Sequence, residues 1–159
     1  MTNNTQALTV AAATGAALTG GVFFAFSSFV MSGLDRLPGR DAIVAMQAIN
    51  KAAPSPLFMT ALFGTAVLSV GTGVVAVRRI DDPSAVYLLV GSGLYLAGVV
   101  LTVAYHVPRN DALALVDANR LDATEIWRNY ATGWTAWNHV RTFTSLASAV
   151  MFILALIAE

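Results

Sequence analysis

Cysteine is absent from the chain, and charged residues are scarce. Without cysteine the chain can form no disulfide, no thiolate nucleophile, no cysteine-ligated zinc site and no iron–sulfur cluster. Only 11% of the 159 residues are charged, whereas a soluble domain carries roughly a quarter. Nine basic and nine acidic residues cancel, so there is no net field to attract nucleic acid, and we exclude nucleic-acid binding.

Charge is missing altogether from four long apolar windows, at residues 7–34, 57–77, 84–108 and 142–158. A helix needs roughly 20 residues to cross a hydrocarbon core about 30 Å thick, and lipid forces it to pair its own backbone groups. The windows show neither the alternation of barrel strands nor the polar face of a soluble helix. The sequence therefore predicts an all-α integral membrane protein. Its spans are expected at about 7–33, 57–78, 84–107 and 133–158.

The order of these spans predicts an antiparallel four-helix bundle that forms a single transmembrane domain. The first and third connections are long enough for short helices at the membrane interface, at about 41–52 and 110–130, and they share one face of the membrane. They carry six Lys and Arg residues against two in the second connection, which favours a cytoplasmic position in a bacterial cytoplasmic membrane. Residues 1–34 lack the basic start of a signal peptide, so we expect the first span to stay in the mature protein.

Polar and aromatic residues gather at the start of the fourth span. On a helix that turns 100° per residue, one face holds Trp134, Trp137, Asn138, Arg141, Ser145 and Ser148, continued backwards by Tyr130 and Trp127. A guanidinium near the hydrocarbon edge costs a few kcal/mol unless it is paired or lines a wet cavity, so Arg141 and Asn138 predict a site. For the tryptophans the alternative is an aromatic belt at headgroup level, with Arg141 reaching out to water. His139 projects about 140° away from Trp134 and so faces a different neighbour.

A second polar group, from His106 to Asp111, lies at the exit of the third span. Pro108 has no N–H and disfavours helix at Val107, so we expect the chain to bend there and to leave backbone carbonyls free. Asn110 then either turns back over the bundle or caps the next short helix. Gln47 and Asn50 form a smaller polar patch in the first connection, and a solvated face is the alternative for them.

These residues resemble the anthrone oxygenase family of small four-span membrane proteins, most of them grouped under a domain of unknown function. The resemblance covers nearly the whole chain. Its motifs are the run Met46 to Asn50, the triplet Arg109-Asn110-Asp111, and the pattern Trp127-x-x-Tyr130-x-x-x-Trp134-x-x-Trp137-Asn138-His139-Val140-Arg141-Thr142. Many members carry asparagine and leucine in place of His106 and Arg109, so the resemblance gives neither residue an essential role. Named relatives convert an anthrone intermediate of polyketide synthesis to an anthraquinone with O2.

The resemblance implies an oxidoreductase, an anthrone-type monooxygenase that acts on a planar hydrophobic phenolic substrate at the membrane interface. Molecular oxygen is then the co-substrate, and no cofactor or metal is predicted. Such a reaction needs a base, groups that hold an oxyanion and a dry pocket. The predicted catalytic residues are His139 as the base, with Arg141 and Asn138 as oxyanion partners. The predicted substrate-binding residues are Trp134, Trp137, Tyr130, Asn110, Gln47 and Asn50.

Two other interpretations stay open. In the first, the protein is a non-catalytic membrane module, and the same groups bind lipid headgroups, a partner subunit or a small molecule. In the second, His106 and His139 are the axial ligands of one b-type haem between the third and fourth spans. Membrane lipids, a hydrophobic small molecule and a second copy of the chain, as in a homo-oligomer, are the partners compatible with the sequence.

Overall fold

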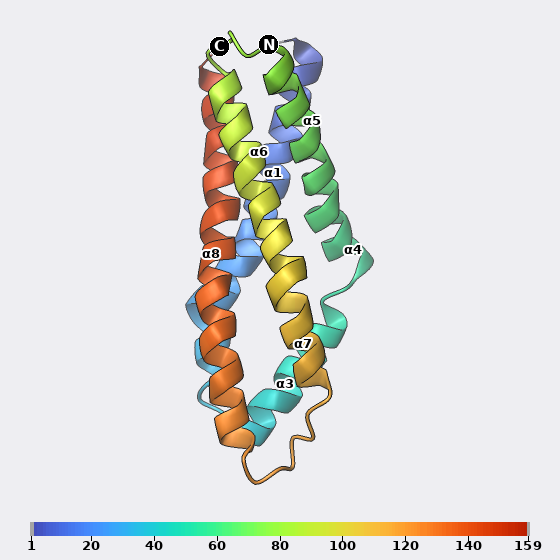
Figure 1. Cartoon of the computed structure of the whole chain (residues 1–159), viewed down its shortest axis with the longest axis vertical. Coiled ribbons are helices and arrows are strands. Elements are labelled where there is room, and N and C mark those ends of the chain that lie inside the picture. The colour runs from blue at the N-terminus through green and yellow to red at the C-terminus, as the bar shows by residue number, and fades with distance from the viewer. Residues whose placement is uncertain (1, 159) are drawn as a thin grey trace.

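The computed structural model describes residues 2–158, and within them the chain forms helices and no strand (Figure 1). In this part of the chain four helices are long and apolar enough to cross a membrane: Asn3–Leu34, Pro56–Arg78, Ala85–Ala114 and Ala123–Ile157. The prediction of an all-α protein with four spans is therefore confirmed. The first, third and fourth helices run past their predicted ends, because a helix can continue beyond the hydrocarbon where its charged side chains reach water.

The long helices pack as an antiparallel four-helix bundle. In the described structure α1 (Asn3–Ala25) and α6 (Ala85–Leu101) each pack against both α5 (Thr65–Arg78) and α8 (Ala123–Ile157), which closes the ring. Figure 1 shows both chain ends and the α5–α6 turn at one end of the molecule, and the first and third connections at the other. The predicted placement of those two connections on one face is thus reproduced by the fold.

Small residues let the helices approach closely. Ala12 and Ala16 of α1 are fully buried. A methyl group added to Gly20 would lie 2.7 Å from Leu146 of α8, and one added to Gly98 would lie 2.9 Å from the Thr144 hydroxyl. Because lipid tails offer no hydrophobic drive for helix association, such close backbone contacts hold the bundle together.

Three segments in residues 2–158 wind more loosely, as π-helix: η1 (Phe26–Val30), η2 (Thr60–Gly64) and η3 (Thr102–His106). The third one runs directly into α7 (Val107–Ala114), so the span stays helical through Pro108. The prediction that the helix breaks at Val107 is therefore wrong, because Val107 and Pro108 both lie within α7. Proline has no N–H, and its ring crowds the preceding turn, but a π turn widens that turn and leaves room for the ring.

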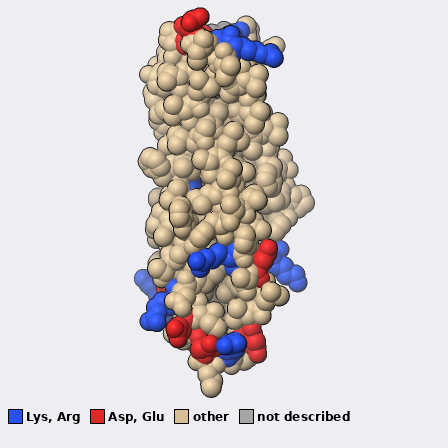
Figure 2. Space-filling view, viewed as in Figure 1, with Lys and Arg blue, Asp and Glu red and all other residues tan. Residues whose placement is uncertain are grey.

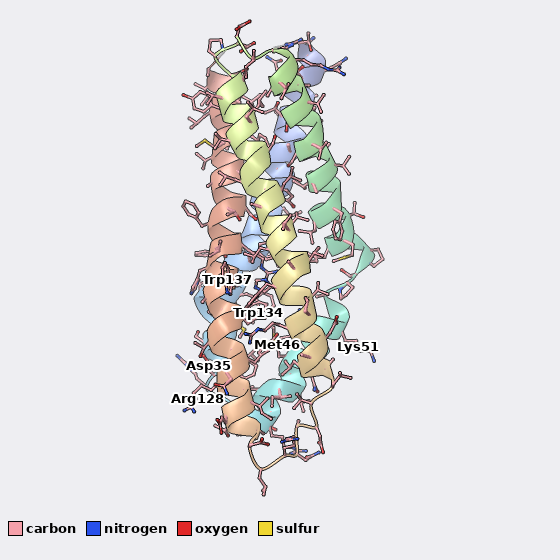
Figure 3. The ribbon with its side chains drawn as sticks, in the orientation of Figure 1. Asp35, Met46, Lys51, Arg128, Trp134 and Trp137 are labelled. Atoms are coloured by element: carbon pink, nitrogen blue, oxygen red, sulfur yellow. The ribbon has the colours of Figure 1, made fainter. Side chains whose placement is uncertain are left out.

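The first connection contains α2 (Met31–Leu34), α3 (Gly39–Ala52) and α4 (Pro56–Met59). Helix α3 is the predicted interfacial helix, and its inner face buries Ala42, Ile43 and Met46. Figure 3 shows Met46 pointing inward, whereas Lys51 and Arg128 of α8 point away from the bundle. The α3 helix thus closes the end of the bundle with an apolar face inside and a charged face outside.

The third connection differs from its prediction. Its short helix is α7, which continues the third span instead of standing apart over residues 110–130. Residues 115–122 form turns. The carboxylate of Asp117 accepts hydrogen bonds from the backbone and side chain of Asn119, at 3.0 and 3.1 Å, and these bonds lower the pKa of Asp117. Asp and Asn favour turns over helix for this reason.

Charged side chains gather at the two ends of the molecule and leave a broad middle with almost no charge on the face that Figure 2 shows. The larger charged region covers the end that carries the first and third connections. This distribution matches a protein whose middle lies in hydrocarbon and whose ends lie at the two membrane surfaces.

Candidate functional site

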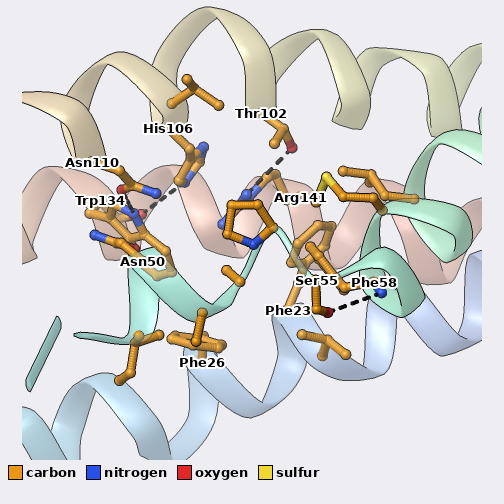
Figure 4. Close-up of a pocket in the computed structure, with 18 residues that line it drawn as sticks. Phe23, Phe26, Asn50, Ser55, Phe58, Thr102, His106, Asn110, Trp134 and Arg141 are labelled. Carbon is orange, nitrogen blue, oxygen red and sulfur yellow. Dashed lines mark hydrogen bonds between the residues drawn. The ribbon is translucent and has the colours of Figure 1, made fainter. Parts of the chain in front are cut away.

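A cavity of about 440 Å³, here named the central pocket, lies between α1, the α3–α4 segment, the η3–α7 segment and α8 (Figure 4). Its volume falls within the roughly 300–1,000 Å³ typical of small-molecule sites. The walls are mainly aromatic and aliphatic, and they include Phe23, Phe26, Phe58 and Trp134. Each π segment contributes to the lining, with Phe26, Leu62, Thr102 and His106. Because π turns occur frequently at functional sites, their convergence here marks the pocket as the candidate site.

Arg141 brings a buried positive charge to the pocket wall from α8. It is 5% exposed, and its Nη2 donates to Asn138 Oδ1 at 2.7 Å. Nη1 lies 3.4 Å from the Thr102 hydroxyl, and Cζ lies 4.2 Å from the centre of the Phe23 ring and 5.2 Å from that of Trp134. Its Nε has no hydrogen-bond partner within residues 2–158.

No carboxylate neutralises this guanidinium in the described structure, where the ion pair that forms joins Arg120 to Asp122. A buried charge costs several kcal/mol unless it is paired and hydrogen-bonded. The two aromatic faces and the neutral hydrogen bonds around Arg141 offset part of that cost. The guanidinium therefore retains the capacity to bind an anionic oxygen in the central pocket.

Asn138 lies behind Arg141 and does not line the pocket. It is fully buried, and its Nδ2 donates to the Phe23 carbonyl and to the Ser27 hydroxyl, both at 2.8 Å. These bonds fix the amide so that Oδ1 faces the guanidinium. Asn138 is therefore placed to position Arg141, and its predicted direct role as an oxyanion partner gains no support from the geometry.

Four of the predicted substrate-binding residues come together at the end of the pocket nearest the first and third connections. Trp134 Nε1 and the Tyr130 hydroxyl both donate to Asn110 Oδ1 at 2.9 Å. Asn50 Nδ2 donates to the Tyr130 oxygen at 3.3 Å. The network joins α3, α7 and α8, and Asn50, Asn110 and Trp134 line the pocket while Tyr130 supports them from behind.

Gln47 and Trp137 lie elsewhere. Gln47 Nε2 donates to the carbonyls of Leu113 and Val116, at 2.9 and 3.0 Å, and so fastens α3 to the end of the third span. Trp137 is 45% exposed and packs beside Tyr105, with ring centres 5.5 Å apart. For Trp137 the structure favours the aromatic belt over a pocket wall.

The two histidines of the chain lie in different places. His139, the predicted base, is exposed and lines two surface depressions, one with Arg128 and one with Phe143. His106 is 1% exposed and lines the central pocket, with its Nε2 3.4 Å from the Trp134 carbonyl oxygen. The surroundings of the two rings are thus separate, and a haem between the two rings stays an untested alternative.

A metal cluster is not evident, because no three His, Asp or Glu side chains in the described chain are placed to hold an ion. The absence of a cofactor stays a prediction. Sequence reasoning missed Phe23, Phe26, Phe58 and Thr102 as pocket residues, and it gave His106 a role only as a haem ligand and none in the oxygenase. A partial signal for His106 is present in the sequence, because the hydroxyl-bearing residues Ser92, Tyr95 and Thr102 of the third span recur at helical spacing and the same spacing continues to His106.

A family model described as anthrone oxygenase matches residues 55–151, which is more than half of the chain. The matched segment includes Ser55, Asn110, Trp134 and Arg141 of the pocket and excludes α1 and α3. No curated protein and no solved structure matches the chain. The resemblance seen in the sequence is confirmed by the family match, and the chain belongs to the anthrone oxygenase family.

Proposed function

We propose that the protein is a membrane-embedded oxygenase that binds a planar phenolic substrate of the anthrone type in the central pocket and lets it react with O2. Family membership supports this assignment. The observation that carries it is the guanidinium of Arg141, which is buried in an apolar wall and has no carboxylate partner in residues 2–158. Such a cation suits an anion that forms on the substrate during the reaction.

The proposed chemistry needs no electron donor other than the substrate. Loss of a proton from the methylene carbon of an anthrone gives a carbanion whose charge is shared with the carbonyl oxygen. Arg141 stabilises that oxyanion and so favours the loss of the proton. The carbanion then forms a C–O bond with O2 and reduces it to a peroxide, which takes back the proton. Loss of water, with the second methylene hydrogen, leaves the new carbonyl of an anthraquinone.

His106 replaces His139 as our proposed base. It is the imidazole that lines the central pocket, whereas His139 faces outward. With Nε2 directed at the Trp134 carbonyl, the proton belongs on Nε2. Nδ1 is then the nitrogen without the proton; it is buried and accepts no hydrogen bond in the described chain, so the ring has to turn toward the pocket to take a proton from the substrate.

The rim of the pocket suits a substrate that arrives from the lipid. Val22 and Val107 line the pocket and are 36% and 45% exposed, so the opening is bordered by apolar side chains of membrane-spanning helices. A hydrophobic phenol dissolved in the bilayer, and O2, which is more soluble in hydrocarbon than in water, can both enter sideways. Water is held back by the same side chains.

The test is anthrone oxidation by the purified protein in lipid nanodiscs, followed by O2 uptake and anthraquinone absorbance. Arg141→Gln should lower kcat/KM by about 100-fold, the usual loss when one oxyanion contact is removed. Arg128→Gln, on an exposed position of the same helix, is the matched control and should keep the wild-type rate. Wild-type turnover no faster than that of empty nanodiscs, or a folded Arg141→Gln variant with full activity, would overturn the proposal.

The base is tested in the same assay by changing the two histidines separately. His106→Gln should lower kcat by about 100-fold or more, within the range for loss of a general base, and His139→Gln should have little effect. The opposite result would restore His139 as the base. If the wild type binds anthrone and turns none over, the protein is a binding module and not an oxygenase.

A further inference from the structure

Trp134 determines which atom donates and which accepts in the hydrogen bonds that link Asn50, Tyr130 and Asn110. An indole N–H can only donate, so the Asn110 atom 2.9 Å from it must be the amide oxygen. The Tyr130 hydroxyl donates to the same oxygen, and its own oxygen therefore accepts from the amide nitrogen of Asn50. The two ends of an asparagine amide are usually hard to tell apart, but here the network determines both.

This network leaves one polar atom of each asparagine unused. Nδ2 of Asn110 and Oδ1 of Asn50 have no hydrogen-bond partner among residues 2–158. Both residues are half-buried and line the pocket. Figure 4 shows them at one end of the pocket, away from Arg141. The central pocket thus presents a cation at one place and a neutral donor–acceptor pair at another.

We propose that Asn50 and Asn110 form a subsite for a neutral hydroxyl group, so that the pocket prefers a planar ligand with an oxyanion at one end and a hydroxyl at the other. This inference rests on the proposed function for the occupancy of the pocket. A hydroxyl donates one hydrogen bond and accepts others, which matches Oδ1 of Asn50 and Nδ2 of Asn110. An ionised oxygen would be repelled by Oδ1 of Asn50, so it belongs beside Arg141.

The position of the pair gives the ligand a direction in the membrane. Lys51 follows Asn50 and Arg109 precedes Asn110, so the asparagine end of the pocket adjoins the charged end of the molecule. A phenol in a bilayer already turns its hydroxyl toward the surface and its rings toward the hydrocarbon. It can therefore enter from the lipid and meet the asparagines without turning over.

The subsite also discriminates against ligands without the hydroxyl. When such a ligand fills the pocket, it removes water from the two amide groups and offers them no bond in return. A site that is built to bind a hydroxyl rejects the analogue that lacks it, because the buried polar groups of the site are left unpaired. Anthrones hydroxylated at the edge of a lateral ring, far from the carbonyl, are the substrate class that fits both ends.

The experiment measures binding without turnover, in nanodiscs under anaerobic conditions, by titration calorimetry. Its two probes are anthrone and a hydroxyanthrone that differs by one hydroxyl at the far edge of a lateral ring. The wild type should bind the hydroxylated probe about tenfold more tightly, the difference expected for one satisfied pair of hydrogen bonds. Equal affinity for the two probes would overturn the proposal.

Asn110→Asp is the decisive variant. Aspartate keeps an oxygen for Trp134 and Tyr130 but replaces the amide donor with a second acceptor. The preference for the hydroxylated probe should fall by about tenfold and so disappear. Asn119→Asp, on an exposed position in the third connection, is the matched control and should keep the preference. Asn50→Ser, which removes the acceptor amide, should also weaken it, and a preference that survives in both pocket variants contradicts the inference.

The experiments distinguish a failure of the oxygenase proposal from a failure of the proposed asparagine subsite. Anthrone turnover without any preference between the probes leaves the oxygenase standing and removes the subsite. A preference in binding without turnover leaves the subsite standing and removes the oxygenase. If neither probe binds to the folded wild-type protein, both are wrong.

Discussion

The proposed role of Arg141 is to bind an anion beside its guanidinium. A substitution at Thr102 can place a charge of the protein's own at that position. The Thr102 hydroxyl lies 3.4 Å from Nη1, and the residue lines the central pocket. Thr102→Asp supplies an internal carboxylate where we expect the substrate oxyanion, while Thr102→Asn has the same size and no charge.

We predict that Thr102→Asp lowers kcat/KM for anthrone at least tenfold more than Thr102→Asn does, because the carboxylate pairs with Arg141 and repels the oxyanion. Thermal unfolding in detergent should show Thr102→Asp at least as stable as Thr102→Asn, since the buried cation gains its counter-ion. Steady-state kinetics and the two melting temperatures are the measurements. Equal losses of activity in the two variants would show that Arg141 does not meet an anion.

Helical spacing predicted the inner face of α8 well. Tyr130, Trp134, Asn138 and Arg141 were all placed on one face, and all are buried. Trp137 was placed on the same face and is 45% exposed. Spacing gives the angle between residues, but where the buried face ends depends on which helices pack beside it. That boundary is a property of the fold, and a single sequence does not contain it.

The π segments show a second limit of reading one sequence. Pro108 was expected to end the third span, and a wider turn at Thr102–His106 carries the helix through it instead. Isolated residues give no signal for such a turn, because its stability comes from the packing around it. The consequence is functional, since the loosened turns place Phe26, Thr102 and His106 in the pocket wall.

Helix α3 depends on a close contact at its first residue. A methyl group added to Gly39 would lie 2.5 Å from Cα of Thr124 in α8, whereas one added to Gly33 in α2 would meet no atom within 4 Å. Gly39→Ala must therefore push α3 away from α8. Because α3 carries Ile49 and Asn50 into the pocket wall, the displacement reaches the site.

We predict that Gly39→Ala lowers the free energy of unfolding by about 1–3 kcal/mol, the usual cost of overpacking against a rigid neighbour. Gly33→Ala should be neutral or raise it by up to about 1 kcal/mol, because alanine favours helix over glycine. Denaturant titration in mixed micelles, followed by circular dichroism, compares the two. Equal stability of both variants would show that α3 is held only loosely.

The arrangement of the spans was the part most open to prediction from the sequence. Charge-free windows located all four helices, since the cost of charge in hydrocarbon is large and does not depend on the details of packing. The position of charges along the sequence did not predict the central pocket. It forms where α3 and the α3–α4 segment fold in beside α1 and α7, and long-range contacts decide that placement.

The absence of cysteine makes the topology directly testable, because any introduced thiol is the only one. Leu37, Ile80 and Leu121 are 42%, 62% and 108% exposed and mark the first, second and third connections. With a membrane-impermeant maleimide, single cysteines at positions 37 and 121 should react from the same side and one at position 80 from the other. We expect the shared side to be the cytoplasm. Labelling of positions 37 and 121 from opposite sides would contradict the bundle.

The lone charge of Arg141 bears on how long the protein survives in its membrane. Without an anion beside it, the buried guanidinium destabilises the bundle, and the oxyanion of the proposed substrate would remove that cost. Ligand at 100 times its Kd adds about 2.7 kcal/mol of stability. If the proposed substrate binds, proteases that attack transiently opened molecules should degrade the vacant protein faster than the occupied one. The amount of protein in the cell would then rise with the supply of its substrate.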